Sequence, residues 1–499
     1  MNQPNRSVAD NAATELLLKP KQPGTSIQNW LYREIRQAVL GGRLGPGERL
    51  PSTRRMAADW DIARGTVVAA YEQLAAEGYL ESLQGSGYFV SPELPDQPVT
   101  PVPPAAPRNE AAGPYKAKPD APRSPFPIAG DYAPQAFRPF QPDSDHFPRR
   151  LWGRLLSSVA RHSDGAEFRF GEAAGSRPLR KEIAKYLSKA RGVRCTASQV
   201  VIVSGTQHAL EMVGRVLLAN GDTAAVEDPA YGGALTAFDR PGVTRLALPV
   251  DDDGLDVERL ESLDPAPRLV YVTPTNQCPL GMAMSLERRF RLLEWARKSG
   301  AYIFEDDYDG EFRYAGRPLP ALQGLDGAQS VIYAGTFNKT MFASLRLGYL
   351  VLPPALVEGF LHIRSSSDRF PPGLEQAALA RFLRDGYFTR HIRRMRKVYA
   401  ARLELLRRKA AEYLPDLKID NKATGLETIA WLPPWSDDVL VAERLNAAGV
   451  AAQPLSRFCV NRVLEPGLIL GFASVPEPMI VEGVRKAAAV LEENNGRLA

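Results

Sequence analysis

A proline-rich stretch limits what this chain can fold into more than any other feature of the sequence. Eleven prolines fall between residues 92 and 125, where apolar residues show almost no periodicity. Because proline fixes its own φ and lacks a backbone N–H, such a stretch favours extended polyproline conformations over helix or sheet. We therefore predict a linker over residues 93–125 that spaces two parts of the chain. The length of 499 residues agrees, since it exceeds what one hydrophobic core can hold.

The composition excludes several classes of protein. Hydrophobic residues make up 44% of the chain and charged residues 24%, as in ordinary soluble globular proteins. The net charge of +5 is only weak evidence for nucleic-acid binding. The three cysteines, Cys195, Cys278 and Cys459, are too scattered for a disulfide framework or a metal site. No run reaches the roughly 18 apolar residues of a membrane span, so we expect a cytoplasmic protein without a metal or a membrane partner.

The region before the linker carries signals for a compact helical module. After a polar leader over residues 1–25, apolar residues recur at helical spacing from Ile27 to Leu40. A glycine-rich turn then delivers Ser52 as the N-cap of a short helix, Thr53 to Trp60, and a second helix follows from Ala63 to Glu77. Two short helices across a tight turn are typical of a helix-turn-helix.

A β-hairpin wing is predicted after these helices. The segment Leu83 to Val90 contains Gly85 and Gly87, which suit a tight hairpin tip. We therefore predict a mainly helical winged helix-turn-helix with a β wing over residues 26–92. Basic side chains gather around its helix starts, where they and backbone N–H groups can reach phosphates and base edges: Arg43, Arg54, Arg55 and Arg64.

This module resembles the winged helix of GntR-type bacterial regulators. The matching motifs are LPSTRRMA, ARGTVVAAYEQL, EGYL and GSGYFV. Ala63 departs from that family, which often has Ser or Thr there, and this puts one phosphate contact in question. The resemblance implies that double-stranded DNA is a partner. Together with the placement of the arginines, it predicts the DNA-binding residues Arg43, Ser52, Arg54, Arg64, Thr66 and Gly85.

The region after the linker, residues 126–499, predicts an α/β domain. Short apolar strands alternate with amphipathic helices, a pattern typical of a mostly parallel sheet with helices on both faces. Within it, the strand Val200 to Val203 leads through a tight turn into a helix that begins at Gln207. Free N–H groups and the Thr206 hydroxyl at this helix start predict an anion site.

One lysine lies where lysines are rare. Val331 to Tyr333 predicts a short buried strand that Gly335 and Thr336 break, and Lys339 emerges at the end of that turn. Between this strand and the apolar residues that follow, the lysine would be partly desolvated. Desolvation favours the neutral amine that forms a Schiff base with an aldehyde. Three polar side chains nearby would hold a phosphate: Thr336, Asn338 and Arg346.

Two further motifs suit a planar cofactor. The segment DPAY leaves a strand and offers Tyr231 as an aromatic face for stacking. The segment EDDY ends a buried strand and places Asp306, Asp307 and Tyr308 at its carboxyl end, where α/β sheets bind ligands. A carboxylate that faces a pyridine nitrogen keeps the nitrogen protonated and makes the ring an electron sink.

Residues 126–499 resemble the fold-type I aminotransferases, because SGTQ, DPAY, EDDY and GTFNK occur in the order and at about the spacing found there. The resemblance implies pyridoxal phosphate as the cofactor, with Lys339 forming its aldimine. It also implies that Asp306 pairs with the pyridine nitrogen, Tyr308 bonds the phenolic oxygen and Tyr231 stacks on the ring. Asp307 replaces Asp306 if the register shifts by one. The residues expected around the phosphate are Thr206, Gln207, Thr336, Asn338 and Arg346.

Two departures from the aminotransferase pattern concern electronic tuning and the substrate. In the segment TPTNQCPLG, Cys278 stands where aminotransferases usually have the asparagine that bonds the phenolic oxygen, so Asn276 or Gln277 would substitute. The segment Leu468 to Ala473 lacks the arginine that often binds a substrate carboxylate. Arg457 is then the best remaining candidate to hold an effector carboxylate in a bidentate pair.

Together, the two parts resemble the MocR/GabR subfamily of GntR-type regulators. The resemblance implies a pyridoxal phosphate-dependent transcriptional regulator that senses an amino acid or amine through exchange at the cofactor aldimine. We expect a homodimer whose winged helices read separate half-sites, and a switch rather than an enzyme, although a slow half-reaction fits the same residues. The alternatives are an active aminotransferase with a DNA-binding head, and a dimer scaffold that holds no cofactor.

Overall fold

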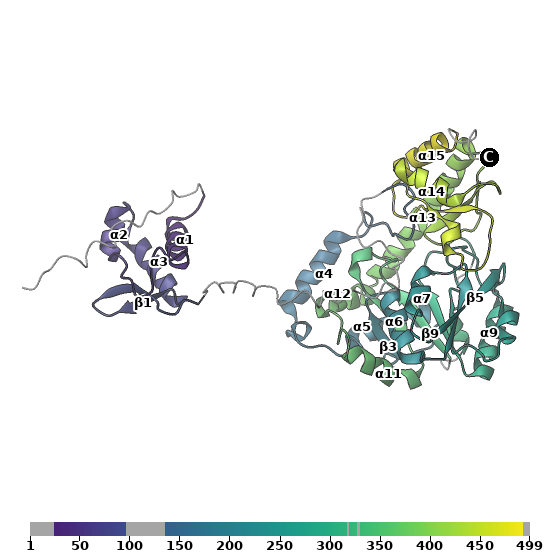
Figure 1. Ribbon diagram of the computed structural model, residues 1–499, viewed down its shortest axis with the longest axis horizontal. Coiled ribbons are helices and arrows are strands. Elements are labelled where there is room, and N and C mark those ends of the chain that lie inside the picture. Colours follow the sequence, from purple (N-terminus) through teal and green to yellow (C-terminus); the bar gives the residue numbers. More distant parts are fainter. Residues whose placement is uncertain (1–23, 96–134, 317–318, 327–329, 493–499) are drawn as a thin grey trace, which may run out of the picture. The chain divides into compact units, whose positions relative to one another are not determined.

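The computed structural model describes residues 24–95, 135–316, 319–326 and 330–492. The chain divides into two compact units, residues 1–117 and 118–499 (Figure 1). The predicted leader up to residue 23 and the predicted linker from residue 96 onward lie outside the described residues. The predicted domain boundaries therefore stay predictions.

Three helices and a hairpin form the first unit. Its elements are α1 (Ile27–Leu40), α2 (Thr53–Asp59), α3 (Arg64–Ala76), β1 (Leu80–Leu83) and β2 (Gly87–Val90). Ser26 and Ser52 cap α1 and α2, because each hydroxyl accepts a hydrogen bond from the backbone N–H three residues on, at 3.3 Å. The helices bury their apolar stripes in one core around Leu31, Val67 and Tyr71. The predicted winged helix-turn-helix is confirmed.

An eight-stranded sheet forms the centre of the second unit. Its strand order is β3-β10-β9-β8-β7-β4-β5-β6. Neighbours from β9 to β5 run parallel, whereas β10 runs antiparallel to both of its neighbours and β6 runs antiparallel to β5. The predicted mostly parallel sheet is confirmed. The strands are β3 (Val200–Val203), β4 (Thr223–Asp228), β5 (Thr244–Asp251), β6 (Gly254–Leu255), β7 (Leu269–Val272), β8 (Tyr302–Asp307), β9 (Val331–Thr336) and β10 (Gly348–Val351).

Helices cover both faces of this sheet, because its buried strands send alternate side chains to opposite sides. Val201 and Val203 pack with α6, α7 and α11, whereas Val200 and Ile202 pack with α5, α12 and α13. The helices of the unit are α4 (Arg149–His162), α5 (Arg177–Ala190), α6 (Thr206–Leu217), α7 (Gly232–Ala237), α8 (Val257–Glu261), α9 (Leu286–Ser299), α10 (Leu322–Asp326), α11 (Pro354–Ser365), α12 (Gly373–Arg384), α13 (Tyr387–Tyr413), α14 (Asp438–Ala447) and α15 (Glu477–Glu492). Single 3-10 turns are η1 (Ala166–Phe168), η2 (Ala343–Leu345) and η3 (Leu455–Phe458).

The strand before Lys339 is longer than the sequence predicts. Gly335 and Thr336 do not break it: they belong to β9 and pair with Tyr349 and Gly348 of β10. A Cβ on Gly335 would lie 2.4 Å from the Tyr349 hydroxyl oxygen. The glycine therefore allows the close approach of a tyrosine within the sheet, and the turn begins only after Thr336.

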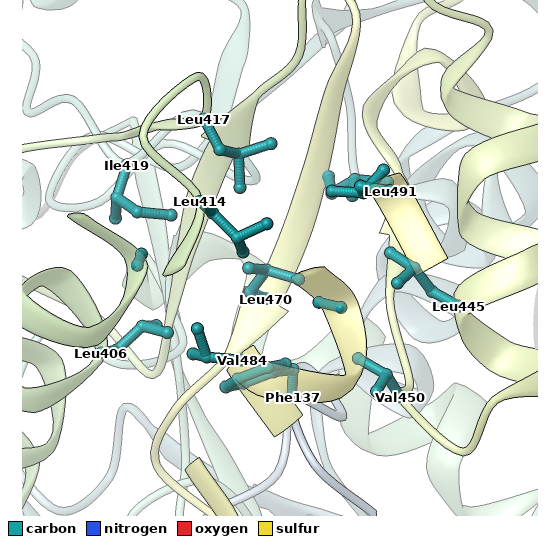
Figure 2. A pocket seen from close by; sticks show the side chains of 13 residues that line it. Phe137, Leu406, Leu414, Leu417, Ile419, Leu445, Val450, Leu470, Val484 and Leu491 are labelled. Carbon is teal, nitrogen blue, oxygen red and sulfur yellow. The ribbon is translucent and has the colours of Figure 1, made fainter. Parts of the chain in front are cut away.

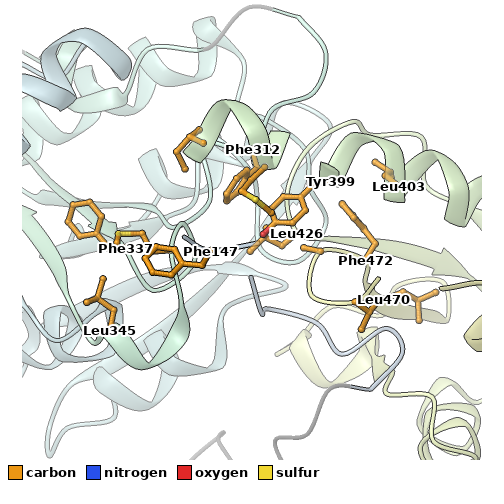
Figure 3. Packing of buried hydrophobic residues seen from close by; sticks show 14 of the residues in the cluster. Phe147, Phe312, Phe337, Leu345, Tyr399, Leu403, Leu426, Leu470 and Phe472 are labelled. Atoms are coloured by element: carbon orange, nitrogen blue, oxygen red, sulfur yellow. The ribbon is translucent and has the colours of Figure 1, made fainter. Parts of the chain in front are cut away.

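A smaller antiparallel sheet lies in the C-terminal part of the unit, with the order β11-β12-β14-β13. Its strands are β11 (Lys418–Ile419), β12 (Glu427–Trp431), β13 (Gln453–Pro454) and β14 (Gly467–Gly471). Figure 3 shows part of one hydrophobic cluster that contains Phe337 and Leu345, on either side of Lys339 in the sequence, together with Tyr399, Leu470 and Phe472. The turn that carries Lys339 is thus packed against the C-terminal part of the unit.

An apolar pocket lies among the C-terminal elements (Figure 2). All thirteen residues that line it are apolar, and most come from α13, α15 and β14. No polar group there could orient a charged cofactor. The polar site lies elsewhere, at the carboxyl ends of the parallel strands.

The described residues contain neither a membrane-spanning helix nor a candidate metal-binding cluster. None of their helices is long and apolar enough to cross a membrane. Over the same residues, no group of three or more His, Cys, Asp or Glu side chains could hold a metal ion.

Candidate functional site

Lys339 lies in the turn after β9, where it is half-buried. Its Nζ donates a hydrogen bond to the Phe140 carbonyl oxygen and lies 5.4 Å from the centre of the Phe140 ring. Burial lowers the pKa of this lysine, although the negative charges of Glu427, Asp309 and Asp306 oppose the shift. The neutral amine is therefore favoured relative to an exposed lysine, in agreement with the prediction from the sequence.

Asp306 stands at the end of β8 with one oxygen partnered and one not. Its Oδ2 accepts a hydrogen bond of 2.9 Å from the Tyr271 hydroxyl, whereas Oδ1 is buried and has no partner. Burial raises the pKa of Asp306 to about 7, while the Tyr271 hydrogen bond and the Lys339 charge act in the opposite direction. Buried carboxylate oxygens without a partner are rare, so Oδ1 marks a place for a donor.

The next residue, Asp307, points to the opposite face of the sheet. Arg191 holds it in a bidentate pair, with Nε–Oδ2 and Nη2–Oδ1 distances of 2.7 and 2.9 Å. The Tyr333 hydroxyl donates a further hydrogen bond of 2.5 Å to Oδ2. All three residues are buried, so both oxygens of the Asp307 carboxylate already have partners within the protein. The geometry therefore favours Asp306 over Asp307 as the acid of the site.

Replacing the two aspartates separately tests this choice. Asp307→Asn leaves the buried Arg191 charge uncompensated and should cost about 3–5 kcal/mol of unfolding free energy. Asp306→Asn removes a buried carboxylate without a cation partner and should leave the unfolding free energy within about 1 kcal/mol, but weaken pyridoxal phosphate binding at least about tenfold. Urea unfolding and cofactor titration measure both effects. The opposite pattern, with cofactor binding lost only in Asp307→Asn, would assign the site to Asp307.

The start of α6 gathers the predicted anion-binding side chains. Gly205 precedes Thr206, the first residue of the helix, and adopts a φ of +115°. A Cβ on Gly205 would lie 2.7 Å from Asn338 Nδ2 and 3.7 Å from Arg346 Nη1. Only glycine allows this approach, which sets an amide and a guanidinium beside free backbone N–H groups. The hydroxyl of Thr336 accepts a hydrogen bond of 3.1 Å from the Asn338 N–H and fixes that turn.

Tyr231 and Gln207 lie together next to this helix start. A Cβ on Gly233 would lie 2.4 Å from the Tyr231 ring and 2.3 Å from Gln207 Oε1, so both side chains close over that glycine. Gln207 Nε2 donates to the Gly233 carbonyl oxygen at 3.2 Å, while its Oε1 is buried without a partner. Burial raises the pKa of the Tyr231 hydroxyl, and the charges of Asp306 and Arg346 both act on it. Tyr231 thus lies close enough to interact electrostatically both with Asp306 and with Arg346.

Asn276, rather than Gln277, lies beside Tyr308. Its Nδ2 is 3.3 Å from the Tyr308 hydroxyl and 2.8 Å from Asp309 Oδ2. Gln277 Nε2 donates instead to the carbonyl oxygens of Pro229 and Cys278, both at 2.9 Å. The sequence left these two residues as alternatives for the missing asparagine, and the geometry favours Asn276.

Two acidic residues of the site were not predicted. Asp309 is 1% exposed, and Glu427, at the start of β12, has both carboxylate oxygens buried without a hydrogen-bond partner. Both carboxylates act electrostatically on Lys339. Glu427 comes from the C-terminal sheet and belongs to no local motif with Lys339, so the sequence pattern could not reveal it. Phe140 was missed for the same reason.

The structure does not bring Arg457 into this buried group. Its side chain is 62% exposed and lies 3.6 Å from the Glu443 carboxylate on α14. Its neighbour Phe458 contacts the ring of Phe140, with centroids 5.9 Å apart. The predicted role of Arg457 in effector binding therefore stays a prediction.

In the first unit, the predicted DNA-binding residues lie around the starts of α2 and α3 and on the wing, except for Arg43, which lies in the turn after α1. Thr66 is half-buried, and exposed positions are taken by Arg43, Ser52, Arg54, Arg64 and Gly85. Arg64 Nε is 3.4 Å from the Thr53 hydroxyl, which joins the starts of α2 and α3. Ala63 caps α3 without a side-chain hydrogen bond. Arg49, also exposed, lies beside the wing, where its Nε would be 3.8 Å from a Cβ on Gly87.

Comparison with known proteins gives the same two parts. The family model for bacterial regulatory proteins of the gntR family matches residues 28–90, and that for aminotransferase class I and II matches residues 148–484. The probable rhizopine catabolism regulatory protein MocR of Rhizobium meliloti is 38% identical over 97% of this chain and 98% of its own length. The chain belongs to the MocR/GabR subfamily of GntR-type regulators. It is thus a transcriptional regulator with an aminotransferase-like domain.

Further relatives agree with this membership. The HTH-type transcriptional regulator TauR of Rhodobacter capsulatus is 31% identical over 93% of this chain and 96% of its own. The kynurenine aminotransferase of Pyrococcus horikoshii, solved in complex with PMP, is 30% identical and covers 73% of this chain and 92% of its own, with a TM-score of 0.67. Pyridoxal phosphate is the cofactor of the regulator, and the winged helix marks it as a DNA-binding protein.

Proposed function

We propose that this regulator holds pyridoxal phosphate on Lys339 and senses an amino acid or another primary amine at the same position, so that the amine changes DNA binding. The observation that carries the proposal is a half-buried lysine with a lowered pKa that lies within electrostatic reach of Asp306, whose Oδ1 lacks a partner. This pair lies in a chain that also has a DNA-reading module. A dimer scaffold that holds no cofactor would need neither this lysine nor this carboxylate.

The residues fit the cofactor at three points. The partnerless Oδ1 of Asp306 would accept a hydrogen bond from the protonated pyridine nitrogen. Tyr308 and Asn276 would bond the phenolic oxygen, and Tyr231 would stack on the ring. The start of α6 would hold the phosphate, through backbone N–H groups and the side chains of Thr206, Gln207, Thr336, Asn338 and Arg346.

The chain's own residues explain how an amine would be registered. When bound, pyridoxal phosphate supplies an aldehyde that condenses reversibly with primary amines. An incoming amine would displace Lys339, and the released Nζ would donate to the Phe140 carbonyl oxygen, the contact present in this structure. The low-pKa environment keeps the released lysine partly neutral, so it can return when the amine leaves.

Phe140 offers a route from this lysine toward the linker. It lies close to residue 135, the first described residue of the unit, and adopts a φ of +64°, which is costly for a residue other than glycine. A hydrogen bond from the released Lys339 would stabilise this conformation. The amine would thereby favour one arrangement of the segment that follows the linker over another. It can shift the free-energy difference between these two arrangements by no more than the difference in its binding free energy for them.

Replacing Phe140 by glycine should separate sensing from output. The variant removes the ring and the cost of the positive φ, while Lys339 stays in place. We expect the visible spectrum of the bound cofactor to change with an added amine as in the parent. The effect of that amine on operator affinity should fall from about fivefold or more to below about twofold. An unchanged effect on operator affinity would exclude this route.

We also propose that the regulator acts as a homodimer. Phe168 and Phe170 are 63% and 81% exposed, although Phe170 forms a T-shaped pair with Phe370, with centroids 5.7 Å apart, and the Arg369 guanidinium lies over its ring. Exposed aromatic side chains at adjacent positions favour a protein interface. A dimer would present two winged helices to separate half-sites. Sedimentation equilibrium should give twice the chain mass, and a monomer at micromolar concentration would contradict the proposal.

An active aminotransferase with a DNA-binding head is the alternative function. It needs the same lysine and acid, and the likeness to aminotransferases favours it. A steady-state transaminase assay with a keto acid, run beside an operator-binding assay, distinguishes the two. We expect amine-dependent operator binding and at most a single slow half-reaction. Sustained turnover without any effect of the amine on operator affinity would support the alternative.

A further inference from the structure

The surroundings of Lys339 carry more negative than positive charge. Glu427, Asp309 and Asp306 act on the lysine, and Asp309 and Glu427 also act on each other. Within the described residues, neither Glu427 nor Asp309 forms an ion pair with an arginine or lysine. Burial, together with the neighbouring carboxylate, raises the pKa of Asp309, and burial raises that of Glu427 to about 7. A cation or a strong hydrogen-bond donor bound beside Asp309 and Glu427 would stabilise the ionised form of both.

The same cluster contains hydrogen-bond acceptors that no hydrogen bond of regular geometry satisfies within the described residues. Both oxygens of Glu427 are buried without a hydrogen bond of regular geometry, although the Phe140 N–H and the Tyr308 hydroxyl favour its ionised form. Asn276 is 5% exposed, and its Oδ1 is buried without a partner while its Nδ2 binds Asp309. Unsatisfied buried acceptors are costly, so this cluster is suited to a ligand that donates.

Nothing on the adjacent strand supplies that donor. In the register of β12 and β14, Glu427 pairs with Gly471, which has no side chain, and the nearby Ile469 is apolar and fully buried. Arg457, the predicted partner of an effector carboxylate, is 62% exposed and pairs with Glu443 instead. Wherever Glu427 and Asp309 are ionised, a carboxylate placed among them would meet like charges in a buried site.

We infer that the effector sensed at Lys339 is a primary amine whose second functional group donates hydrogen bonds, an ammonium or a hydroxyl group, and not a carboxylate. Glu427 and the Asn276 Oδ1 accept from that second group. This inference rests on the proposed function, because it presumes that an amine is sensed at Lys339. It replaces the amino acid with a diamine or an amino alcohol as the class of effector.

Three amines of equal chain length test the inference: 1,4-diaminobutane, 4-amino-1-butanol and 4-aminobutanoate. Each is titrated into the full-length protein loaded with pyridoxal phosphate, and both the visible spectrum and operator affinity are followed. The diamine should reach half-saturation at a concentration at least about tenfold below that of the amino acid, with the amino alcohol between them, because a hydrogen bond to a charged group discriminates by about that much. A lower half-saturation concentration for 4-aminobutanoate in the parent overturns the inference.

Glu427→Gln keeps the size of the side chain and removes its charge. This variant should reduce the advantage of the diamine over the amino acid to less than about threefold, whereas Glu482→Gln, an exposed glutamate on α15, should keep the parent's order. An undiminished advantage in folded Glu427→Gln contradicts the assignment to Glu427. If Glu427→Gln does not fold, the order of the three amines in the parent decides alone. If no amine alters the spectrum or operator affinity, the proposed function fails and this inference with it.

Discussion

Lys339→Ala should abolish the visible absorption band of the protein loaded with pyridoxal phosphate, together with the reducibility of that band by borohydride. The band requires a covalent bond between the cofactor and a lysine, and Lys339 is the lysine that the turn after β9 places within electrostatic reach of Asp306. The cofactor would still bind through the α6 start and Asp306, but reversibly. Absorbance before and after borohydride, followed by dialysis, measures the effect.

A matched control keeps this result interpretable. Lys298 on α9 has a 69% exposed side chain and pairs with Glu294 at 3.4 Å, so Lys298→Ala should behave like the parent. If Lys339→Ala retains the band and its reducibility, another lysine carries the cofactor. In that case the geometry around Asp306 must serve a different purpose.

Arg64→Ala should have the largest effect on DNA binding among single substitutions in the first unit. Arg64 begins α3, and its exposed side chain lies at the junction with α2. If it reads a base edge, its loss should cost about 1–3 kcal/mol at the operator, or roughly 5- to 150-fold in affinity, and should relax specificity at one position. Arg43 is expected to meet only phosphate. Arg43→Ala should therefore weaken binding to all DNA sequences alike and lower the salt dependence of binding.

Fluorescence anisotropy with operator and non-operator DNA over a range of salt concentrations separates the two variants. Unchanged operator affinity in Arg64→Ala would remove α3 from the role of recognition helix. Equal losses on operator and non-operator DNA would instead place Arg64 on the phosphate backbone.

Much of the fold and part of the site could be predicted from the sequence, because the signals were local. Ser52 as a cap, the helix predicted from Gln207 and found from Thr206, and the lysine after β9 each depend on a few neighbouring residues. Gly335 was misread, because a glycine in a strand can mark a turn or the approach of a side chain, and only the pairing with β10 distinguishes them.

The remaining features of the site depend on contacts between distant segments. Asp306 and Asp307 are equivalent in sequence, and only Arg191 and Tyr271 on opposite faces of the sheet separate them. Glu427 acts electrostatically on Lys339 from the C-terminal sheet, and the two residues are too far apart in the sequence to belong to one motif. Arg457 was chosen by elimination, and the structure leaves its guanidinium at the surface.

The central claim is that an amine bound at Lys339 controls DNA binding by the winged helix. The most direct measurement is the operator affinity of the full-length protein loaded with cofactor, with and without saturating amine, in the parent and in Lys339→Ala. The account predicts a change of about fivefold or more in the parent and none in Lys339→Ala. An amine that alters the cofactor spectrum of the parent and leaves its operator affinity unchanged would contradict the account.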